Sequence, residues 1–275
     1  MIKVAALQMI STPVVQDNLD LAQQLLKQAQ GEGAELAVLP EYFCLMGNRD
    51  KDKLTIQEHI GQGPIQDFLS HQAQSLGIWI VAGTIPLSTQ RDGSSETVYN
   101  ATLVYNPQGE CVCRYDKIHL FQFQTDKEHY DESVTLKPGE QPSYFDVTTS
   151  QGETWRFGLS ICYDLRFAEL YRHYASHQVD VMLVPAAFTY TTGQAHWEIL
   201  LKARAIENLA YVVASAQGGE HLNGRKTFGH SMVIDPWGKT LASMGLGQGV
   251  VVAELDRHHM LNQREQLPAL NHRRL

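Results

Sequence analysis

The 275-residue sequence has few cysteines, no long apolar run and no signal-like amino terminus. Four cysteines in a chain of this length do not form the disulfide framework of a small secreted domain, so they indicate a reducing compartment. No apolar run approaches the roughly 18 residues that span a membrane, and the first residues are too short for a signal h-region. The sequence therefore predicts a cytoplasmic protein that has no membrane partner.

The sequence also lacks an excess of positive charge and the common metal-binding motifs. Lys and Arg total 22 against 30 Asp and Glu, which gives a net charge of −8. This balance disfavours nucleic acid as a partner, because nucleic acid attracts basic proteins. Histidine is plentiful at 12 residues, yet neither an HExxH motif nor paired Cys/His ligand spacing occurs. We therefore expect no metal and no other cofactor.

The apolar residues that are present recur in the same order in both halves of the chain. They make up 43% of the sequence, as is typical of a globular protein with a full core. Periodicity predicts first-half strands at 4–9, 36–39, 78–84, 98–106 and 110–114, with helices beginning at Asp17 and Pro64. It predicts second-half strands at 155–162, 179–184, 211–216 and 230–234, with a helix over 196–209.

The helices of each half need a sheet face to cover. Two sheets that face each other, with the helices outside, satisfy both halves and predict an α/β fold, a four-layer α-β-β-α sandwich. Residues 179–184 and 211–216 are continuous apolar runs, as expected of strands covered on both faces. No linker-like or low-complexity stretch separates the two similar halves, so we predict a single domain over residues 1–275.

Cys162 stands where an apolar strand gives way to helical spacing in the sequence Leu159–Phe167. A sulfur close to a helix N-terminus is favoured as the thiolate, which is the nucleophilic form of cysteine. A buried structural cysteine is the ordinary alternative for a lone strand cysteine. The position makes Cys162 a candidate nucleophile.

Glu41 and Lys117 also follow predicted strands. Glu41 comes after a buried run that ends in Leu39-Pro40, and Lys117 follows the second strand of a predicted hairpin. Taken singly, Glu41 fits a solvated carboxylate or one half of a salt bridge, and Lys117 fits a surface lysine. Together with Cys162 they form a set that contains a base, a cation and a nucleophile.

These three segments resemble the motifs of the carbon–nitrogen hydrolase, or nitrilase, superfamily. The resemblance rests on Leu39-Pro40-Glu41, Lys117-Ile118-His119-Leu120 and the C-Y-D-x-R-F segment from Cys162 to Phe167, and it extends to Asn100 and to Asp235–Gly238. It implies the four-layer nitrilase sandwich, a Glu-Lys-Cys catalytic triad, and association into a homodimer or a larger homo-oligomer.

The resemblance also implies a role for each matching residue. Cys162 would be the nucleophile and Glu41 the general base. Lys117 and the backbone N–H of Tyr163 would stabilise the oxyanion of a tetrahedral intermediate. Glu132 is the best match to a second glutamate, which could orient Lys117 or position the substrate, with Asp131 and Glu128 close enough in sequence to be alternatives.

Three further residues are candidates for substrate contact. Arg166 could pair with a substrate carboxylate, or with Asp164 or Glu169 beside it in the chain. Thr191 lies in a segment without regular pattern that we expect to form a loop at the mouth of the pocket. His196 stands at the start of a predicted helix, where a cap or packing role is the alternative.

Within the superfamily the chain resembles the Nit branch, and most closely its deaminated glutathione amidases. The matching segments are residues 193–207, residues 228–238 and the closing Leu267-Pro268. Such an enzyme cleaves a small-molecule amide that carries a 2-oxo acid end, through a thioester on cysteine. Ala168 departs from the usual proline and is frequent in ω-amidases, so hydrolysis of 2-oxoglutaramate or 2-oxosuccinamate is the alternative. Nitrile hydrolysis or a non-catalytic scaffold role ranks lower.

Overall fold

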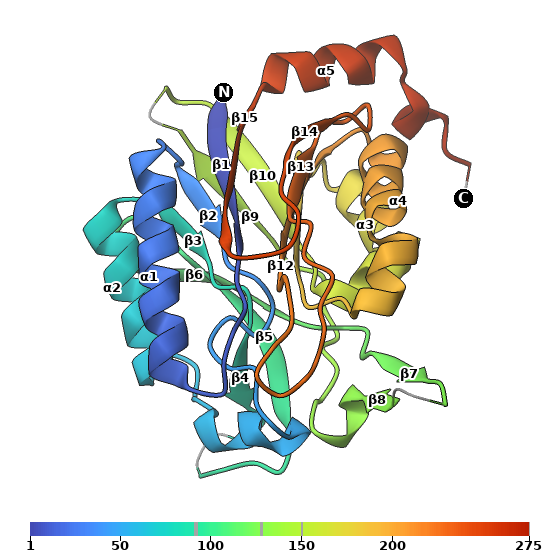
Figure 1. The fold of residues 1–275 in the computed structure, drawn as a ribbon. Helices are drawn as coiled ribbons and strands as arrows, with labels where there is room; N and C mark the ends of the chain where they lie inside the picture. Colours follow the sequence, from blue (N-terminus) through green and yellow to red (C-terminus); the bar gives the residue numbers. More distant parts are fainter. Residues whose placement is uncertain (91–92, 127–128, 150, 275) are drawn as a thin grey trace.

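The computed structural model describes residues 1–90, 93–126, 129–149 and 151–274. The strands of its first sheet are β1 (Ile2–Gln8), β2 (Leu36–Val38), β3 (Trp79–Val81), β4 (Ile85–Ser88), β5 (Val98–Tyr105), β6 (Cys111–Asp116) and β15 (Gly249–Leu255). They lie in the order β15-β1-β2-β3-β5-β4, and β6 also pairs with β5. The strands of the second sheet are β9 (Tyr144–Thr148), β10 (Thr154–Leu159), β11 (Val181–Ala186), β12 (Tyr211–Ala216), β13 (Met232–Ile234) and β14 (Thr240–Ser243). Their order is β14-β13-β12-β11-β10-β9 (Figure 1).

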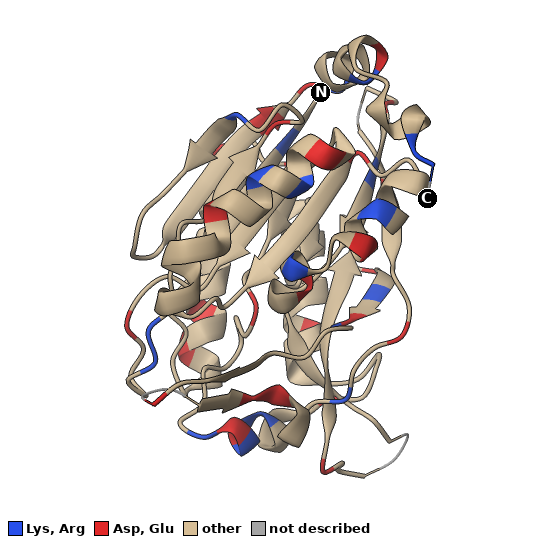
Figure 2. Cartoon of the chain, turned by 90° about the vertical axis from the view of Figure 1, so that its right-hand side faces the viewer, with Lys and Arg blue, Asp and Glu red and all other residues tan. Residues whose placement is uncertain are grey.

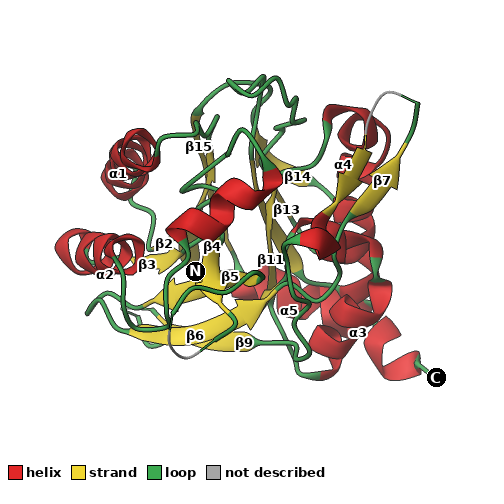
Figure 3. Ribbon diagram, turned by 90° about the horizontal axis from the view of Figure 1, so that it is seen from below, coloured by secondary structure: helices red, strands yellow, loops and turns green. Residues whose placement is uncertain are grey.

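Helices cover the outer face of each sheet. The helices α1 (Val15–Gly31) and α2 (Pro64–Leu76) lie outside the first sheet, and α3 (Ala168–Ser176) and α4 (Tyr190–Asn208) lie outside the second (Figure 3). A ribbon of β7 (Gln122–Gln124) and β8 (His129–Asp131) lies apart from both sheets, and α5 (Arg257–Gln266) follows β15. No helix in these described ranges is long and apolar enough to cross a membrane. The predicted four-layer sandwich is confirmed.

The side chains of β1 show why the layers form. Val4 and Ala6 belong to the core that the two sheets share, whereas Ala5 and Leu7 pack with residues of α1 and α2. Successive side chains of a strand point to opposite faces, so a strand covered on both faces is apolar throughout. Charged side chains lie mainly on helices, loops and strand ends, and the middles of the strands carry few of them (Figure 2).

The two halves of the chain are joined along β1. The last strand, β15, pairs antiparallel with β1 from Ile2↔Leu255 to Gln8↔Gly249, so a strand from the second half completes the sheet of the first half. Just beyond β1, the backbone oxygen of Met9 accepts a 2.8 Å hydrogen bond from Gly218, which follows β12 of the other sheet. This junction brings the carboxyl ends of strands from both sheets together.

Two predicted helix starts are wrong. Helix α1 begins at Val15 rather than Asp17, because the side chain of Asn18 accepts the N–H of Thr12 at 2.7 Å and closes the preceding loop. Helix α4 begins at Tyr190 rather than His196, so the segment 191–194 is helical and not a loop. The side chain of Thr189 caps this helix by accepting the backbone N–H of Thr192.

Candidate active site

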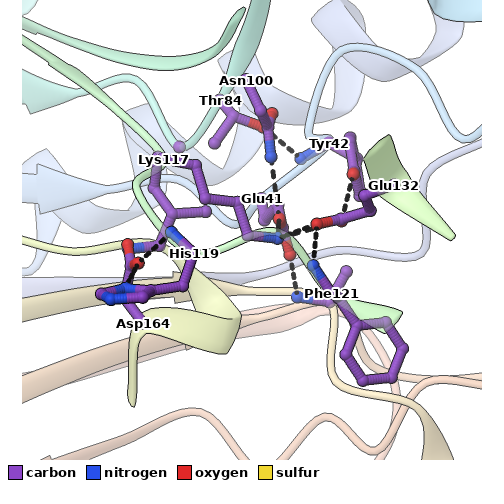
Figure 4. Close-up of polar contacts among 12 residues, drawn as sticks. Glu41, Tyr42, Thr84, Asn100, Lys117, His119, Phe121, Glu132 and Asp164 are labelled. Atoms are coloured by element: carbon purple, nitrogen blue, oxygen red, sulfur yellow. Dashed lines mark hydrogen bonds and ion pairs between the residues drawn. The ribbon is translucent and has the colours of Figure 1, made fainter. Parts of the chain in front are cut away.

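Glu41 follows the buried end of β2, and its carboxylate is held by both sheets. Only 1% of the residue is exposed. Its Oε1 accepts a 2.9 Å hydrogen bond from Nδ2 of Asn100 on β5 (Figure 4). Its Oε2 accepts a 2.8 Å hydrogen bond from the backbone N–H of Ala187, directly after β11. The orientation of this carboxylate therefore depends on the packing of one sheet against the other.

Lys117 follows β6 and is fully buried between two carboxylates. Its Nζ lies 2.9 Å from Oε1 of Glu41 and 2.8 Å from Oε2 of Glu132 (Figure 4). Burial alone would lower the pKa of Lys117, but the charges of Glu132 and Glu41 outweigh burial and raise that pKa above its usual value. The side chain therefore stays an ammonium, and the surface lysine considered from the sequence is ruled out.

Glu132 opens the short 3₁₀ segment η2 (Glu132–Val134) and binds Lys117 with both oxygens. It also accepts hydrogen bonds from the hydroxyl of Tyr42 at 2.8 Å and the backbone N–H of Phe121 at 2.7 Å. Burial acts to raise the pKa of Glu132, yet Lys117 lowers it below the usual range, so the carboxylate remains charged. Of the sequence alternatives, Asp131 instead caps Ser133 at the surface, and Glu128 lies outside the described residues.

Cys162 begins the 3₁₀ segment η3 (Cys162–Arg166) with a left-handed backbone, at φ of 49°. A residue other than glycine in this region is strained by about 1 kcal/mol, so other contacts must hold the turn. Asp164 supplies them: Oδ2 accepts from the N–H of Ile161 at 2.8 Å and the hydroxyl of Tyr115 at 2.7 Å, and Oδ1 accepts from the N–H of His119 at 3.0 Å. Tyr115 and His119 flank the buried lysine, so Asp164 fixes the cysteine turn to the lysine segment.

The expectation that the Cys162 sulfur lies at the N-terminus of an α-helix is wrong. The residue is buried, with 8% exposed, and it opens a short 3₁₀ turn rather than an α-helix. Burial raises the pKa of the Cys162 thiol well above its usual value, the charge of Glu41 raises it further, and Lys117 opposes them. The sulfur therefore rests as a thiol and needs a base before it can attack.

This protonation state predicts how Cys162 reacts with an alkylating agent. Only the thiolate reacts, and its fraction grows about tenfold per pH unit while the pH stays below the pKa. We expect the rate of alkylation of Cys162 by iodoacetamide to rise without a plateau from pH 7 to pH 9, measured by mass spectrometry of the cysteine peptides. The exposed Cys111 serves as an internal reference. A rate that stays constant from pH 7 to pH 9 would show that the thiol is already ionised at rest.

Two adjacent cavities are lined by residues of this site. The inner one is narrow, with about 10 Å³ of water-sized space, and its lining includes Glu41, Cys162, Tyr163, Arg166, Phe188 and Thr192. The outer one measures about 340 Å³. Phe121, Glu132 and Arg225 line both cavities, so the two are adjacent at these side chains.

Of the three candidates for substrate contact, Arg166 lines the inner cavity and the other two do not. Arg166 lines the inner cavity, where its guanidinium lies 5.5 Å from the ring centre of Phe188, and it forms no ion pair with the described carboxylates of Asp164 and Glu169. Thr191 and His196 lie on exposed positions of α4 and outside the inner lining. Because α4 begins earlier than predicted, its neighbour Thr192 faces the cavity instead.

Arg225, Tyr42 and Asp164 are the main residues of the site that sequence reasoning missed. Arg225 lies in a loop after β12 that carries no periodic pattern, so nothing local points to it. Tyr42 follows Glu41 with φ of 57°, a strained position that the sequence does not reveal. Across the described ranges, no group of three or more His, Cys, Asp or Glu side chains is arranged to hold a metal ion.

Comparisons with known proteins show the family of the chain. The sequence matches the family model described as carbon–nitrogen hydrolase over residues 3–264. A deaminated glutathione amidase of a Synechocystis strain is 42% identical over 270 residues, which cover 98% of this chain and 97% of that protein. An omega-amidase of Xenopus laevis is 34% identical, covering 99% of this chain and 95% of that protein.

A solved structure has the same fold as this chain. The crystal structure of the Caenorhabditis elegans NitFhit protein matches with a TM-score of 0.89 at 34% identity. The match covers 99% of this chain and 65% of that longer chain. Sequence and structure thus agree over almost the full length, and the chain belongs to the carbon–nitrogen hydrolase family.

Proposed function

We propose that Glu41, Lys117 and Cys162 are the catalytic residues of an amidase that works through a thioester. The observation that carries the proposal is the buried Lys117 ammonium, held 2.9 Å from Glu41 and 2.8 Å from Glu132 beside the cavity that Cys162 lines. Burying three charges is costly and is a weak source of stability, so a reaction is the better reason for the arrangement.

In the first half of the reaction, Glu41 takes the proton of the Cys162 thiol as the sulfur attacks the amide carbon. The carbonyl oxygen becomes an oxyanion, which the Lys117 ammonium and the backbone N–H of Tyr163 stabilise. A single donor of this kind contributes about 3–4 kcal/mol in other enzymes. The intermediate then collapses: Glu41 gives its proton to the amide nitrogen, the carbon–nitrogen bond breaks, and an acyl thioester remains on Cys162.

In the second half, water replaces the departed amine. Glu41 takes a proton from this water, whose oxygen attacks the thioester carbon, and the same two donors stabilise the second oxyanion. The carbon–sulfur bond breaks, the carboxylic acid leaves, and the proton returns to the sulfur. Glu132 does not touch the reacting atoms in this scheme. It neutralises and orients Lys117, and it is therefore a positioning residue.

We propose deaminated glutathione as the substrate, with Arg166 binding the carboxylate of its 2-oxo acid end. The proposal is supported by the similarity to relatives named deaminated glutathione amidase. It is also supported by the place of Arg166 in the inner cavity without a described carboxylate partner. The leaving amine would be cysteinylglycine. The alternative, ω-amidase activity on 2-oxoglutaramate or 2-oxosuccinamate, is supported by the omega-amidase relatives.

The test is kcat/KM for deaminated glutathione and 2-oxoglutaramate, measured side by side. We expect a large preference for the first, and a preference for the second would establish the ω-amidase alternative instead. Arg166→Met should raise KM for both substrates about ten- to a hundredfold, because both lose a charge-assisted hydrogen bond to the same carboxylate. Unchanged KM values for this variant would remove Arg166 from the carboxylate site.

We further propose a single-domain, cytoplasmic enzyme that assembles as a homodimer or larger homo-oligomer. The pairing of β15 with β1 supports one domain, since the last strand completes the first sheet. Four free cysteines support a reducing compartment. Exposed Ile199 and Ile206 on α4 support self-association, because apolar patches on a surface commonly mark interfaces. Light scattering on the purified protein gives the oligomer mass.

A further inference from the structure

The outer cavity carries cationic side chains that the proposed reaction does not use. It shares Phe121, Glu132 and Arg225 with the inner cavity, and its lining does not include Cys162 or Arg166. A substrate whose 2-oxo acid end is bound at Arg166 therefore has a neighbouring space for its other end. That space is the outer cavity.

Arg225 stands where the two cavities meet, and its guanidinium is only partly satisfied. Its Nη2 donates to the backbone oxygen of Ala187 at 3.1 Å, and its Nη1 lies 4.0 Å from the sulfur of Met46. Its Nε is buried and has no hydrogen-bond partner within the described residues. The guanidinium also lies 5.3 Å from the ring centre of Tyr130. The guanidinium of an arginine stays protonated in proteins, so its charge favours the binding of an anion in this space.

Lys53 adds a second cation to the outer cavity. Its Nζ donates to Oγ1 of Thr135 at 3.2 Å and lies 5.6 Å from the ring centre of Tyr42. In the described part of the chain no ion pair joins it to a carboxylate, whereas Arg49, at the same cavity, is paired with Asp52. Neither cation is in an ion pair within the described residues, although the charge of Glu132 acts on both, and Asp50, Asp131 and Glu132 also line the cavity. The two cations, one at the junction and one inside the cavity, fit an anionic group on the ligand.

We propose that the outer cavity is the leaving-group subsite, and that Arg225 selects substrates whose leaving amine ends in a carboxylate. The proposal rests on the proposed function, in which the leaving amine is cysteinylglycine. That dipeptide spans about 7 Å when extended, so its glycine carboxylate lies well beyond the scissile bond. Ammonia, the leaving group of an ω-amidase substrate, has no such end. Arg225 is thus a residue that distinguishes the two amidase reactions.

The experiment compares deaminated glutathione with the same compound carrying glycinamide in place of its terminal glycine. We expect the wild type to prefer the free carboxylate about ten- to a hundredfold in kcat/KM, the effect of one charge-assisted hydrogen bond. Arg225→Met should abolish most of this preference. General damage to the site lowers both rates together, so the ratio of the two reports the contact with the carboxylate.

Two further variants keep the test decisive. Arg156→Met removes a guanidinium that pairs with Asp146 on the second sheet, and it should retain the wild-type preference. Arg225→Lys keeps a positive charge and should retain part of the preference, which guards against a methionine variant that fails to fold. If the wild type treats both compounds alike, or if Arg225→Met keeps the preference, the subsite proposal is overturned.

The results also distinguish a failure of the subsite proposal from a failure of the proposed amidase function. Efficient cleavage of deaminated glutathione with an unchanged ratio in Arg225→Met overturns the subsite and leaves the proposed function intact. Cleavage of 2-oxoglutaramate without cleavage of either glutathione compound overturns both proposals. A ratio that collapses in Arg225→Met, and only there, supports both.

Discussion

Replacing Cys162 with alanine is expected to lower kcat by about 10⁴-fold or more, because the covalent route through a thioester is lost. Only a sulfur atom is removed, from a residue that is 8% exposed, so the fold should survive. The free energy of unfolding should fall by only about 1–2 kcal/mol. Turnover of deaminated glutathione and of 2-oxoglutaramate, together with urea unfolding, would measure the two effects separately.

Cys44→Ala is the matched control for this substitution. Cys44 is as deeply buried, with 2% exposed, and its thiol points to the backbone oxygen of Thr84 at a sulfur–oxygen distance of 3.7 Å. The same atom is removed from a similar environment, so a similar loss of stability is expected while turnover stays near the wild-type value. Substantial turnover in Cys162→Ala, or equal losses of activity in both variants, would rule out Cys162 as the nucleophile.

Lys117→Met is expected to destabilise the protein by about 3–5 kcal/mol and to abolish turnover. The ammonium is the shared counterion of Glu41 and Glu132, and a neutral side chain would leave these two buried carboxylates without it. Loss of the ammonium also removes one of the two donors proposed for the oxyanion. Urea unfolding at pH 7 and steady-state kinetics would measure these effects.

The pH dependence of stability should differ between this variant and the wild type. In the wild type Lys117 has a raised pKa, so its contribution is complete below the unfolded pKa of about 10.4 and is lost as pH rises through the folded value. Glu132 has a lowered pKa, so its contribution is complete above the unfolded pKa of about 4.3 and is lost as pH falls through the folded value. This ion pair therefore contributes a constant stability between about pH 5 and pH 9.

In Lys117→Met, stability changes with pH in the opposite direction at acidic pH. Without the ammonium, burial raises the pKa of Glu132, so the variant gains stability as pH falls toward 5. The double variant Lys117→Met/Glu132→Gln removes one of the two charges and should recover part of the lost stability while remaining inactive. A loss below about 1 kcal/mol in Lys117→Met, the size of a surface pair, would contradict the buried network.

The sequence by itself predicted the elements whose signals are local. The runs around β11 and β12 are apolar throughout because both faces of these strands are covered, and this pattern also implied the layered sandwich. Pro64 was expected to open a helix, and α2 begins there, since proline suits the first turn of a helix. Glu41, Lys117 and Cys162 could be singled out because each follows a recognisable strand and matches a family motif.

Only the tertiary structure decided the properties that depend on distant segments. The pairing of β15 with β1 joins the first strand to the last one, and no local pattern specifies that partner. The protonation state of Cys162 follows from burial and from Glu41, which lies more than a hundred residues away in the chain. Arg225 lines both cavities although it lies in a loop whose sequence has no periodic pattern. Local propensity acts over a few residues, whereas burial, electrostatic fields and cavities arise only when remote segments pack together.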